Sequence, residues 1–383
     1  MKNLITFILI TSILAGQLIK LPVTNNLGPT LLDFSVIFLV VYGFIKLKFK
    51  PKLPPSYISA GGIFITIASL SLLTTPLHLN KFEYLISFSY TLRFTVIILL
   101  GWIIYSEGLK LSLEKILTFS GVGLAILGLT QFILFPNLTL LENQGWDPHF
   151  FRTVSTFLDP NFAGAYFVLT LILLSTHLGE GKYRQPRVFI IFLAVYFALL
   201  TTFSRSSYLM FLVSGIIYSL LKKSKFLFLS TIILFSVLLL GFQIYTEAVA
   251  KPRNIDREQS AQFRLSTWQQ GLTIFEKSPI LGIGFNAYRY AIKEYNLGNE
   301  EFIKSRGSSG NDSSLLFVSS TTGVVGLIIY LYFLISLIKY SYSKNPVLIS
   351  ALTGLLIHSF FANSLFYPPI FVWLLLISTI PKK

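Results

Sequence analysis

The sequence predicts an all-α polytopic membrane protein with about twelve transmembrane helices and one large extracytoplasmic loop. Three observations predict it. Of the 383 residues, 53% are hydrophobic and only 12% are charged, whereas a soluble domain has about 25% charged residues. Apolar windows of about 20 residues, the length that crosses a bilayer, recur along the chain. Basic residues gather in alternate short loops, as expected for a multi-pass protein.

Twelve apolar windows are expected to be membrane spans. In chain order they are residues 4–20, 28–46, 57–77, 85–105, 112–135, 161–178, 188–203, 206–221, 226–245, 313–338, 346–360 and 363–380. The sixth, seventh, eighth and eleventh windows are at or below the usual length. The first window follows Lys2 without a convincing cleavage site, so we expect a retained span rather than a signal peptide.

The loop charges predict the orientation. With the N-terminus inside, the inner loops hold Lys46, Lys48, Lys50, Lys52, Lys110, Lys115, Lys182, Arg184, Arg187, Lys222, Lys223, Lys225, Lys339, Lys344, Lys382 and Lys383. The short outer loops hold Lys20, Lys81, Arg152 and Arg205. This asymmetry predicts that both termini are inside. The net charge of +15 follows from the same distribution and does not indicate a nucleic-acid partner.

The chain is expected to be a single integral membrane domain, residues 1–383, with residues 246–312 as the large outer loop between the ninth and tenth spans. Within that loop, "EQSAQFRLSTWQQGLTIFEKSP" (258–279) places Leu265, Trp268, Leu272 and Phe275 at helical spacing. This pattern predicts an amphipathic helix at the membrane surface that ends at Pro279. Residues 287–296 suggest a second short helix.

The residue types exclude some chemistry. The chain has no cysteine, so it has neither a disulfide nor a thiolate nucleophile. None of the four histidines stands in a paired metal-ligand spacing. We therefore expect no metal site and no cofactor, with weak binding of a divalent ion by carboxylates alone as the alternative.

Three arginines on the predicted outer side are candidates for binding a diphosphate. Arg152 and Arg205 lie next to predicted membrane edges, and Arg264 lies on the polar flank of the amphipathic helix. A guanidinium is permanently charged and binds phosphate through two parallel hydrogen bonds. An exposed loop arginine is more often merely solvated, but Arg205 occupies a very short polar turn between two apolar spans, which favours a function for it.

Arg93 lies inside a predicted span, where a charge costs at least ~2.5 kcal/mol. Asp33 and Glu83 are candidate partners. A structural hydrogen-bonding role and a substrate-binding role are about equally open for Arg93.

The acidic candidates have two interpretations each. Asp159, Pro160 and Asn161 form a typical helix start, so capping is the first interpretation for Asp159 and Asn161. Asp312, followed by Ser313, stands at the mouth of the tenth span as either a helix cap or a general base that orients an acceptor hydroxyl. His149 is a further candidate base, although a lone loop histidine is more often incidental.

Taken in order, these motifs resemble the O-antigen ligase and O-antigen polymerase superfamily over residues 150–340, the family core. The resemblance is carried by Arg152 before Pro160–Asn161, by Ser204–Arg205, by Arg264, Trp268, Pro279, Gly282 and Gly284, and by Asp312–Ser313 before Gly323 and Gly326.

The resemblance implies a GT-C-like helical fold and an inverting, metal-independent glycosyl transfer outside the plasma membrane. The implied donor is a glycan on undecaprenyl diphosphate, and the acceptor is a sugar hydroxyl on another glycolipid. Arg205 and Arg264 would bind the diphosphate, and Asp312 would be catalytic with them. The candidate substrate-binding residues are Arg152, Arg93, Trp268, Asn161, Ser313 and His149.

One departure affects the choice of reaction. Ligases of the family typically carry His-Asn where this chain has Asp312-Ser313. We therefore favour polymerisation of lipid-linked repeat units, with a chain-length regulator as a candidate partner beside the membrane lipids. Ligase-type transfer of the glycan to a lipid or other acceptor is the alternative. A lipid-linked sugar transporter or flippase, which would need midmembrane substrate groups and broken helices, and a structural membrane protein are the competing classes.

Overall fold

A computed structural model describes residues 2–21, 23, 28–109, 111–144, 146–178, 186–253, 259–305, 307–341 and 345–380. Six of the basic residues used to predict the orientation lie outside the described residues: Lys110, Lys182, Arg184, Lys344, Lys382 and Lys383.

The described part of the chain is built from helices. The α-helices are α1 (Lys2–Ala15), α2 (Leu31–Lys46), α3 (Ser56–Leu73), α4 (Lys81–Tyr105), α5 (Leu113–Leu134), α6 (Pro160–Leu178), α7 (Pro186–Thr202), α8 (Arg205–Leu221), α9 (Lys225–Tyr245), α10 (Gln259–Lys277), α11 (Tyr288–Glu294), α12 (Glu300–Lys304), α13 (Ser314–Ser341), α14 (Pro346–His358) and α15 (Pro368–Ser378). Short helical turns are η1 (Thr139–Gln144), η2 (Ser155–Phe157), η3 (Thr246–Ala250), η4 (Lys251–Arg253), η5 (Gly307–Ser309) and η6 (Ser364–Phe366).

Each of the twelve predicted apolar windows contains a helix, which confirms the all-α fold for the described residues. Among the described residues, six helical segments are long and apolar enough to cross a membrane: α3, α4, α5, α6, α9 with its continuation to Arg253, and the segment Gly307–Tyr340 that covers most of α13. α1, α7, α8, α14 and α15 are shorter apolar helices. The sequence predicted that the ninth span ends at Tyr245. In the structure, η3 and η4 continue the helical path to Arg253.

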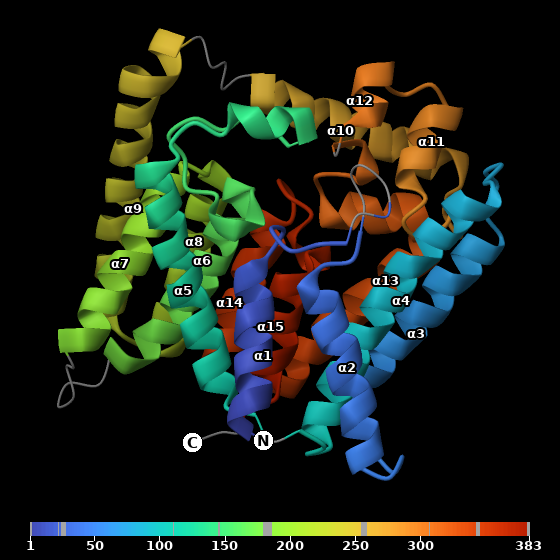
Figure 1. The fold of residues 1–383 in the computed structure, drawn as a ribbon, viewed down its shortest axis with the longest axis horizontal. Coiled ribbons are helices and arrows are strands. Elements are labelled where there is room, and N and C mark those ends of the chain that lie inside the picture. The colour runs from blue at the N-terminus through green and yellow to red at the C-terminus, as the bar shows by residue number, and fades with distance from the viewer. Residues whose placement is uncertain are drawn as a thin grey trace.

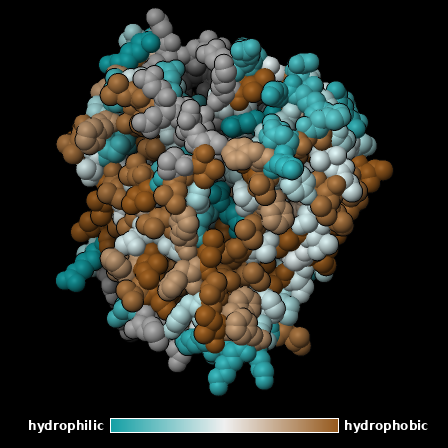
Figure 2. All heavy atoms as spheres, turned by 45° about the vertical axis from the view of Figure 1, so that its right-hand side comes forward, coloured by the Kyte–Doolittle hydropathy of each residue, from teal (hydrophilic) through white to brown (hydrophobic). Residues whose placement is uncertain are grey.

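The helices stand side by side, and α10, α11 and α12 lie across one end of the bundle (Figure 1). The start of α1 lies at the opposite end (Figure 1). Hydrophobic side chains form a broad band around the middle of the visible face, with hydrophilic side chains gathered above and below it (Figure 2). This distribution is that of a membrane protein.

Helix α13 is broken at Gly323, whose φ of 66° and ψ of −171° are not helical. The carbonyls of Ser320 and Thr321 accept instead from the N–H groups of Ile283 and Gly284, at 3.2 and 3.0 Å. On the other side of the break, the next two N–H groups donate to the carbonyls of Pro279 and Ile280: Val324 at 2.8 Å and Val325 at 3.3 Å. The loop between α10 and α11 therefore satisfies all four backbone groups that the break would leave unpaired.

The helix predicted over 258–279 is confirmed as α10, and it packs on the bundle through a stripe other than the predicted apolar one. Its buried positions are Thr267, Gly271 and Ile274, while Leu265 and Leu272 are exposed. Small side chains allow this approach, since a Cβ at Gly271 would lie 2.7 Å from the amide nitrogen of Asn311. Leu265 and Leu272 of the apolar stripe thus face away from the bundle, whereas Trp268 and Phe275 are half-buried. The second short helix is α11, whereas α12 was not expected.

Candidate functional site

A cavity of about 1480 Å³ lies among α1, α4, α6, α8, α10, α11 and the turn between α14 and α15. This volume exceeds that of a site for one drug-sized molecule, roughly 300–1,000 Å³. Seven of the nine candidate residues line it: Arg93, His149, Arg152, Asn161, Arg205, Arg264 and Asp312. These residues come from six separate parts of the chain, so only the tertiary fold brings them together.

Two candidates do not line the cavity. Ser313 is buried, and its hydroxyl accepts from the N–H of Leu316 at 3.4 Å. Ser313 therefore caps α13. Helix capping was one of the two interpretations that the sequence allowed for the neighbouring Asp312. Trp268 donates from Nε1 to the carbonyl of Phe360 at 3.1 Å, which ties α10 to the end of α14.

Arg152 is buried against the end of α7. Its Nε donates to the carbonyl of Thr202 at 2.9 Å, and its Nη2 donates to the carbonyl of Phe203 at 3.3 Å. A cation at a helix C-terminus satisfies carbonyls that lack helical partners. Arg152 thereby holds the short turn from which Arg205 projects.

Asn161, at the start of α6, organises the same turn from the other side. Its Oδ1 accepts from the hydroxyls of Ser204 at 2.7 Å and Ser206 at 3.3 Å. Its backbone carbonyl accepts from the hydroxyl of Ser207 at 3.1 Å. Asn161 thus joins the first turns of α6 and α8, and Arg205 is the first residue of α8.

Asp159 caps α6, as the sequence predicted. Its Oδ1 accepts from the N–H groups of Asn161 at 2.6 Å and Phe162 at 3.2 Å. Burial raises the pKa of the Asp159 carboxyl above its usual value. These two N–H donors and the charges of Arg152 and Arg264 oppose that shift without cancelling it. The carboxylate also lines the cavity, so this cap is close to the cationic groups.

Arg264, on α10, is the electrostatic centre of the site. Its charge acts on Arg205, on Asp159 and on Asp312. Among the described residues, Arg264 forms no ion pair within 4.0 Å. Its charge remains available to a ligand in the cavity.

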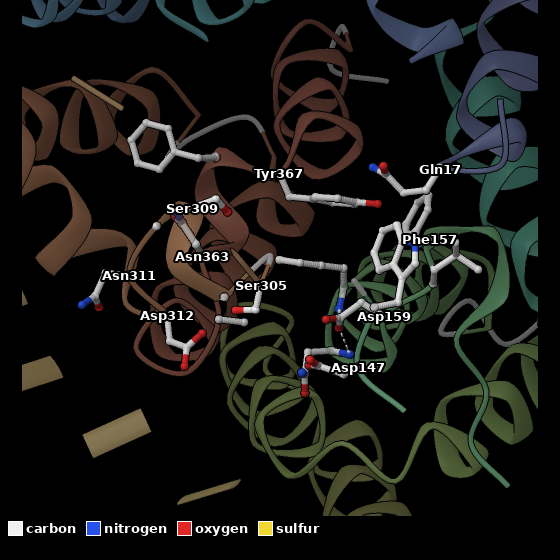
Figure 3. A pocket seen from close by; sticks show the side chains of 18 of the residues that line it. Gln17, Asp147, Phe157, Asp159, Ser305, Ser309, Asn311, Asp312, Asn363 and Tyr367 are labelled. Carbon is white, nitrogen blue, oxygen red and sulfur yellow. Dashed lines mark hydrogen bonds between the residues drawn. The ribbon is translucent and has the colours of Figure 1, made fainter. Parts of the chain in front are cut away.

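Asp312 precedes α13 and accepts from the hydroxyl of Thr267 at 3.3 Å. The neighbouring Asn311 is buried and donates from Nδ2 to the hydroxyl of Tyr288 at 3.0 Å and to the carbonyl of Thr267. Figure 3 shows Asp312 and Asn311 on one side of the pocket and Asp159 on the other. Asp312 is thus fixed beside α10 with its carboxylate at the cavity.

Arg93 has a partner that the sequence left open. Its Nε lies 2.7 Å from Oδ1 of Asp33, and its Nη2 donates to Oδ2 at 2.9 Å. Asp33 also accepts from the N–H and hydroxyl of Thr30, at 2.7 and 2.9 Å. This bidentate pair joins α2 to α4 and neutralises the buried charge, although Arg93 still lines the cavity.

Several cavity residues were missed by the sequence reasoning, including Arg253, Arg289, Asn363 and Tyr367. The two arginines belong to a long loop, and the charge of a long loop does not indicate its side of the membrane. No local pattern therefore identifies them as cavity residues. The other two lie in a turn outside the family core. In the part of the chain that the structure describes, no three His, Asp or Glu side chains form a metal-binding group.

These features define a helical membrane protein with a large cavity near one end, lined by several arginines and a few carboxylates. Residues 189–331 match the protein family described as O-Antigen ligase. The match confirms the resemblance over this segment, which is less than half of the chain. The matched segment carries Arg205, Arg264, Trp268, Asp312 and Ser313. None of the curated proteins matches the chain.

Proposed function

We propose that this protein transfers a glycan from undecaprenyl diphosphate to a sugar hydroxyl of another lipid-linked glycan, and so polymerises repeat units outside the membrane. One observation carries the proposal. Arg205, Arg264 and Asp312, all within the matched segment, line the same cavity although they are far apart in sequence. That arrangement supplies cations for a leaving diphosphate and a carboxylate for an attacking hydroxyl.

The proposed reaction is a single inverting displacement. The acceptor oxygen forms a bond to the anomeric carbon on the face opposite the diphosphate. The bond from that carbon to the phosphate oxygen breaks, and its electron pair leaves with the diphosphate. The hydroxyl proton passes to Asp312. Arg205 and Arg264 stabilise the negative charge that develops on the diphosphate, which lowers the barrier.

Helix starts add to this electrostatic stabilisation. α6, α8 and α13 begin within a residue or two of cavity-lining Asn161, Arg205 and Asp312. The N-terminus of a helix carries a partial positive charge and favours anions. These starts and the arginines act in the same direction on a diphosphate.

The remaining candidates receive more specific roles in the proposal. Arg152 and Asn161 hold the turn that presents Arg205, and His149 contacts the glycan from the cavity wall. Trp268 and Ser313 act indirectly, by fixing α10 and the start of α13. Arg93 binds substrate only through the donors that remain beyond its pair with Asp33.

The proposed topology has twelve spans in a GT-C-like arrangement within the inner membrane. Both termini lie inside, and the cavity opens on the extracytoplasmic side. Two features support it: the start of α1 lies at one end of the bundle, and α10–α12 of the 246–312 loop lie across the other (Figure 1). An even number of spans returns both ends to one side.

Polymerisation is favoured over ligation because Asp312-Ser313 replaces the His-Asn of ligases. An anionic carboxylate can accept the proton of a sugar hydroxyl directly. The acceptor would be a second lipid-linked repeat unit, and a chain-length regulator is the proposed protein partner. Transfer to a different lipid acceptor is the alternative within the family.

The break in α13 is the observation that favours a transporter, because transporters build substrate sites from broken helices. Here the backbone groups freed at the break are bonded to the loop between Pro279 and Gly284. The break therefore docks a loop, which supports the transferase over the transporter.

The test uses purified protein and undecaprenyl diphosphate carrying the native glycan. We expect release of undecaprenyl diphosphate and lengthening of the glycan, without added metal or ATP, measured by mass spectrometry of the lipids. Arg205→Ala, Arg264→Ala and Asp312→Asn should each lower the rate by at least about a hundredfold, because each removes an electrostatic or proton-transfer contribution.

Matched controls are Arg187→Ala and Glu276→Gln, which change exposed charges that do not line the cavity. Both should keep the wild-type rate. Unchanged rates in the Arg205 and Arg264 variants would refute the site. Movement of the lipid across vesicles without a new glycosidic bond would support the transporter instead, and a single transfer without lengthening would support the ligase.

A further inference from the structure

One wall of the cavity is formed entirely outside the matched segment 189–331. It consists of Phe162 on α6, Tyr367 and Asn363 in the turn between α14 and α15, and Gln17 after α1. Figure 3 shows Tyr367 beside Gln17 and above Asp159, with Asn363 nearer to Asp312. Neither the proposed diphosphate site nor the transfer step uses this wall.

The wall has a rigid aromatic core. The rings of Phe162 and Tyr367 stack with centroids 4.2 Å apart and only 6° between their planes. Phe157 packs edge-on against Tyr367 at 5.2 Å. The turn that carries Phe157 is fixed to α1, since the N–H of Gln17 donates to the carbonyl of Thr156 at 2.8 Å. The ring of Tyr367 is thus held in one orientation at the cavity surface.

The same wall carries polar atoms that the protein does not satisfy. Within the described residues, the Oδ1 atom of Asn363 and the hydroxyl of Tyr367 are buried and have no hydrogen-bond partner. The Gln17 side chain lies beside that hydroxyl and acts on it as a hydrogen-bonding group would, so Oδ1 of Asn363 is the stronger evidence for an absent partner. Unpaired buried polar groups cost roughly 1–3 kcal/mol each, so a ligand that supplies hydroxyl groups would relieve them.

We propose that Phe162, Tyr367, Asn363 and Gln17 form a carbohydrate subsite. A sugar ring has apolar C–H faces and a rim of hydroxyl groups, and this wall offers a flat aromatic surface bordered by unpaired amide and hydroxyl groups. A lipid tail would use the rings but leave the polar atoms unpaired. Arg93, the cation whose charge acts on Tyr367, is already paired with Asp33, so a phosphate is less suited to this wall. The chemistry therefore fits an uncharged part of a glycan.

The subsite adjoins the proposed diphosphate site through Asp159. The charge of Asp159 acts on Tyr367, and the charges of Arg152 and Arg264 act on Asp159. A glycan bound against Tyr367 would have its anomeric end directed toward the arginines. The inference rests on the proposed function and adds to it the place where the sugar is bound.

The test compares two lipids on the same purified protein by native mass spectrometry. One probe is undecaprenyl diphosphate carrying the glycan, extracted from cells that lack this protein, and the other is undecaprenyl diphosphate alone. Wild type should bind the glycan-bearing lipid more tightly. Tyr367→Leu should raise the Kd for that lipid about tenfold, equivalent to ~1.4 kcal/mol, and leave the Kd for the bare lipid unchanged.

Two further variants separate the ring from the polar atoms. Tyr367→Phe keeps the stack with Phe162 and should retain most of the preference for the glycan, whereas Asn363→Ala should lose part of it. The subsite is refuted if Tyr367→Leu keeps the full preference, or if it weakens both lipids equally, as a purely structural ring would. Failure of the proposed function is separately visible, because Arg264→Gln would then leave the affinity for both lipids unchanged.

Discussion

At the scale of single residues, Arg152 contributes to the site by holding the turn that carries Arg205. The resemblance made Arg152 a candidate substrate-binding residue beside Arg205 and Arg264, and it lines the cavity. In the structure, two of its nitrogen atoms donate to the carbonyls that end α7. The neighbouring turn carries Arg205, so Arg152 positions the cation that faces the cavity.

Arg93 allows a prediction about stability. Both side chains of its pair with Asp33 are largely buried, with 23% and 10% exposed. Arg93→Leu strands a buried carboxylate and should lower the free energy of unfolding by about 2 kcal/mol, below the 3–5 kcal/mol of a fully buried pair. Thermal unfolding in detergent measures the loss.

The double variant Arg93→Leu/Asp33→Asn distinguishes pairing from substrate binding. Asn at position 33 carries no charge and can still accept from Thr30. The double variant should recover most of the lost stability, and full recovery of transfer activity with it would contradict the substrate contact proposed for Arg93. Recovered stability with activity still absent would show that Arg93 contacts the substrate itself.

At the scale of elements, the break in α13 and the loop from Pro279 to Gly284 form one unit. Gly323 in α13 and Gly282 in the loop both have positive φ, 66° and 71°. A Cβ on Gly323 would lie 2.1 Å from the carbonyl oxygen of Ile280. Gly282 and Gly323 are about 40 residues apart in sequence. Their positive φ angles are both needed where the loop contacts the break in α13.

Gly323→Ala should therefore release the loop that follows α10. Backbone strain at such a conformation costs of order 1–3 kcal/mol, and the steric clash adds to it. We expect a lower melting temperature and faster tryptic cleavage after Lys277, the exposed last residue of α10. Both are measured on the purified protein in detergent.

Gly62→Ala is the matched control, because a Cβ there meets nothing within 4 Å and the residue lies within α3. Alanine in a helix interior is favoured over glycine by roughly 0.5–1 kcal/mol, so this variant should be as stable as wild type or slightly more so. Equal behaviour of the two variants would contradict the docking role of the break.

At the scale of the whole molecule, the start of α1 and α10–α12 lie at opposite ends of the bundle (Figure 1). The absence of cysteine makes the proposed orientation directly testable. A cysteine at Ser266, exposed on α10, should react with a membrane-impermeant maleimide added to intact cells. A cysteine at Lys223, exposed between α8 and α9, should react only after the membrane is opened.

The opposite labelling pattern would invert the topology and place the cavity on the cytoplasmic side. Labelling of both positions in intact cells would contradict an odd number of membrane crossings between residues 223 and 266. Both outcomes leave the fold unchanged, since they concern only its orientation in the membrane.

The sequence by itself determined the helical class, the position of each apolar helix, the capping of α6 by Asp159 and the helix over 258–279. These properties depend on local hydrophobic periodicity and on hydrogen bonds between neighbouring residues. The family match shows that motifs which are weak alone indicated the family correctly when taken in order.

Only the tertiary structure decided which polar residues meet. The partner of Arg93, the contact of Arg152 with the end of α7 and the wall containing Tyr367 all depend on helix packing. Contacts such as Arg93 with Asp33 join helices about 60 residues apart, and no local pattern encodes such a distance. Hydrophobic burial selects a helix face, but the neighbour that the face meets is set by the packing of the whole bundle.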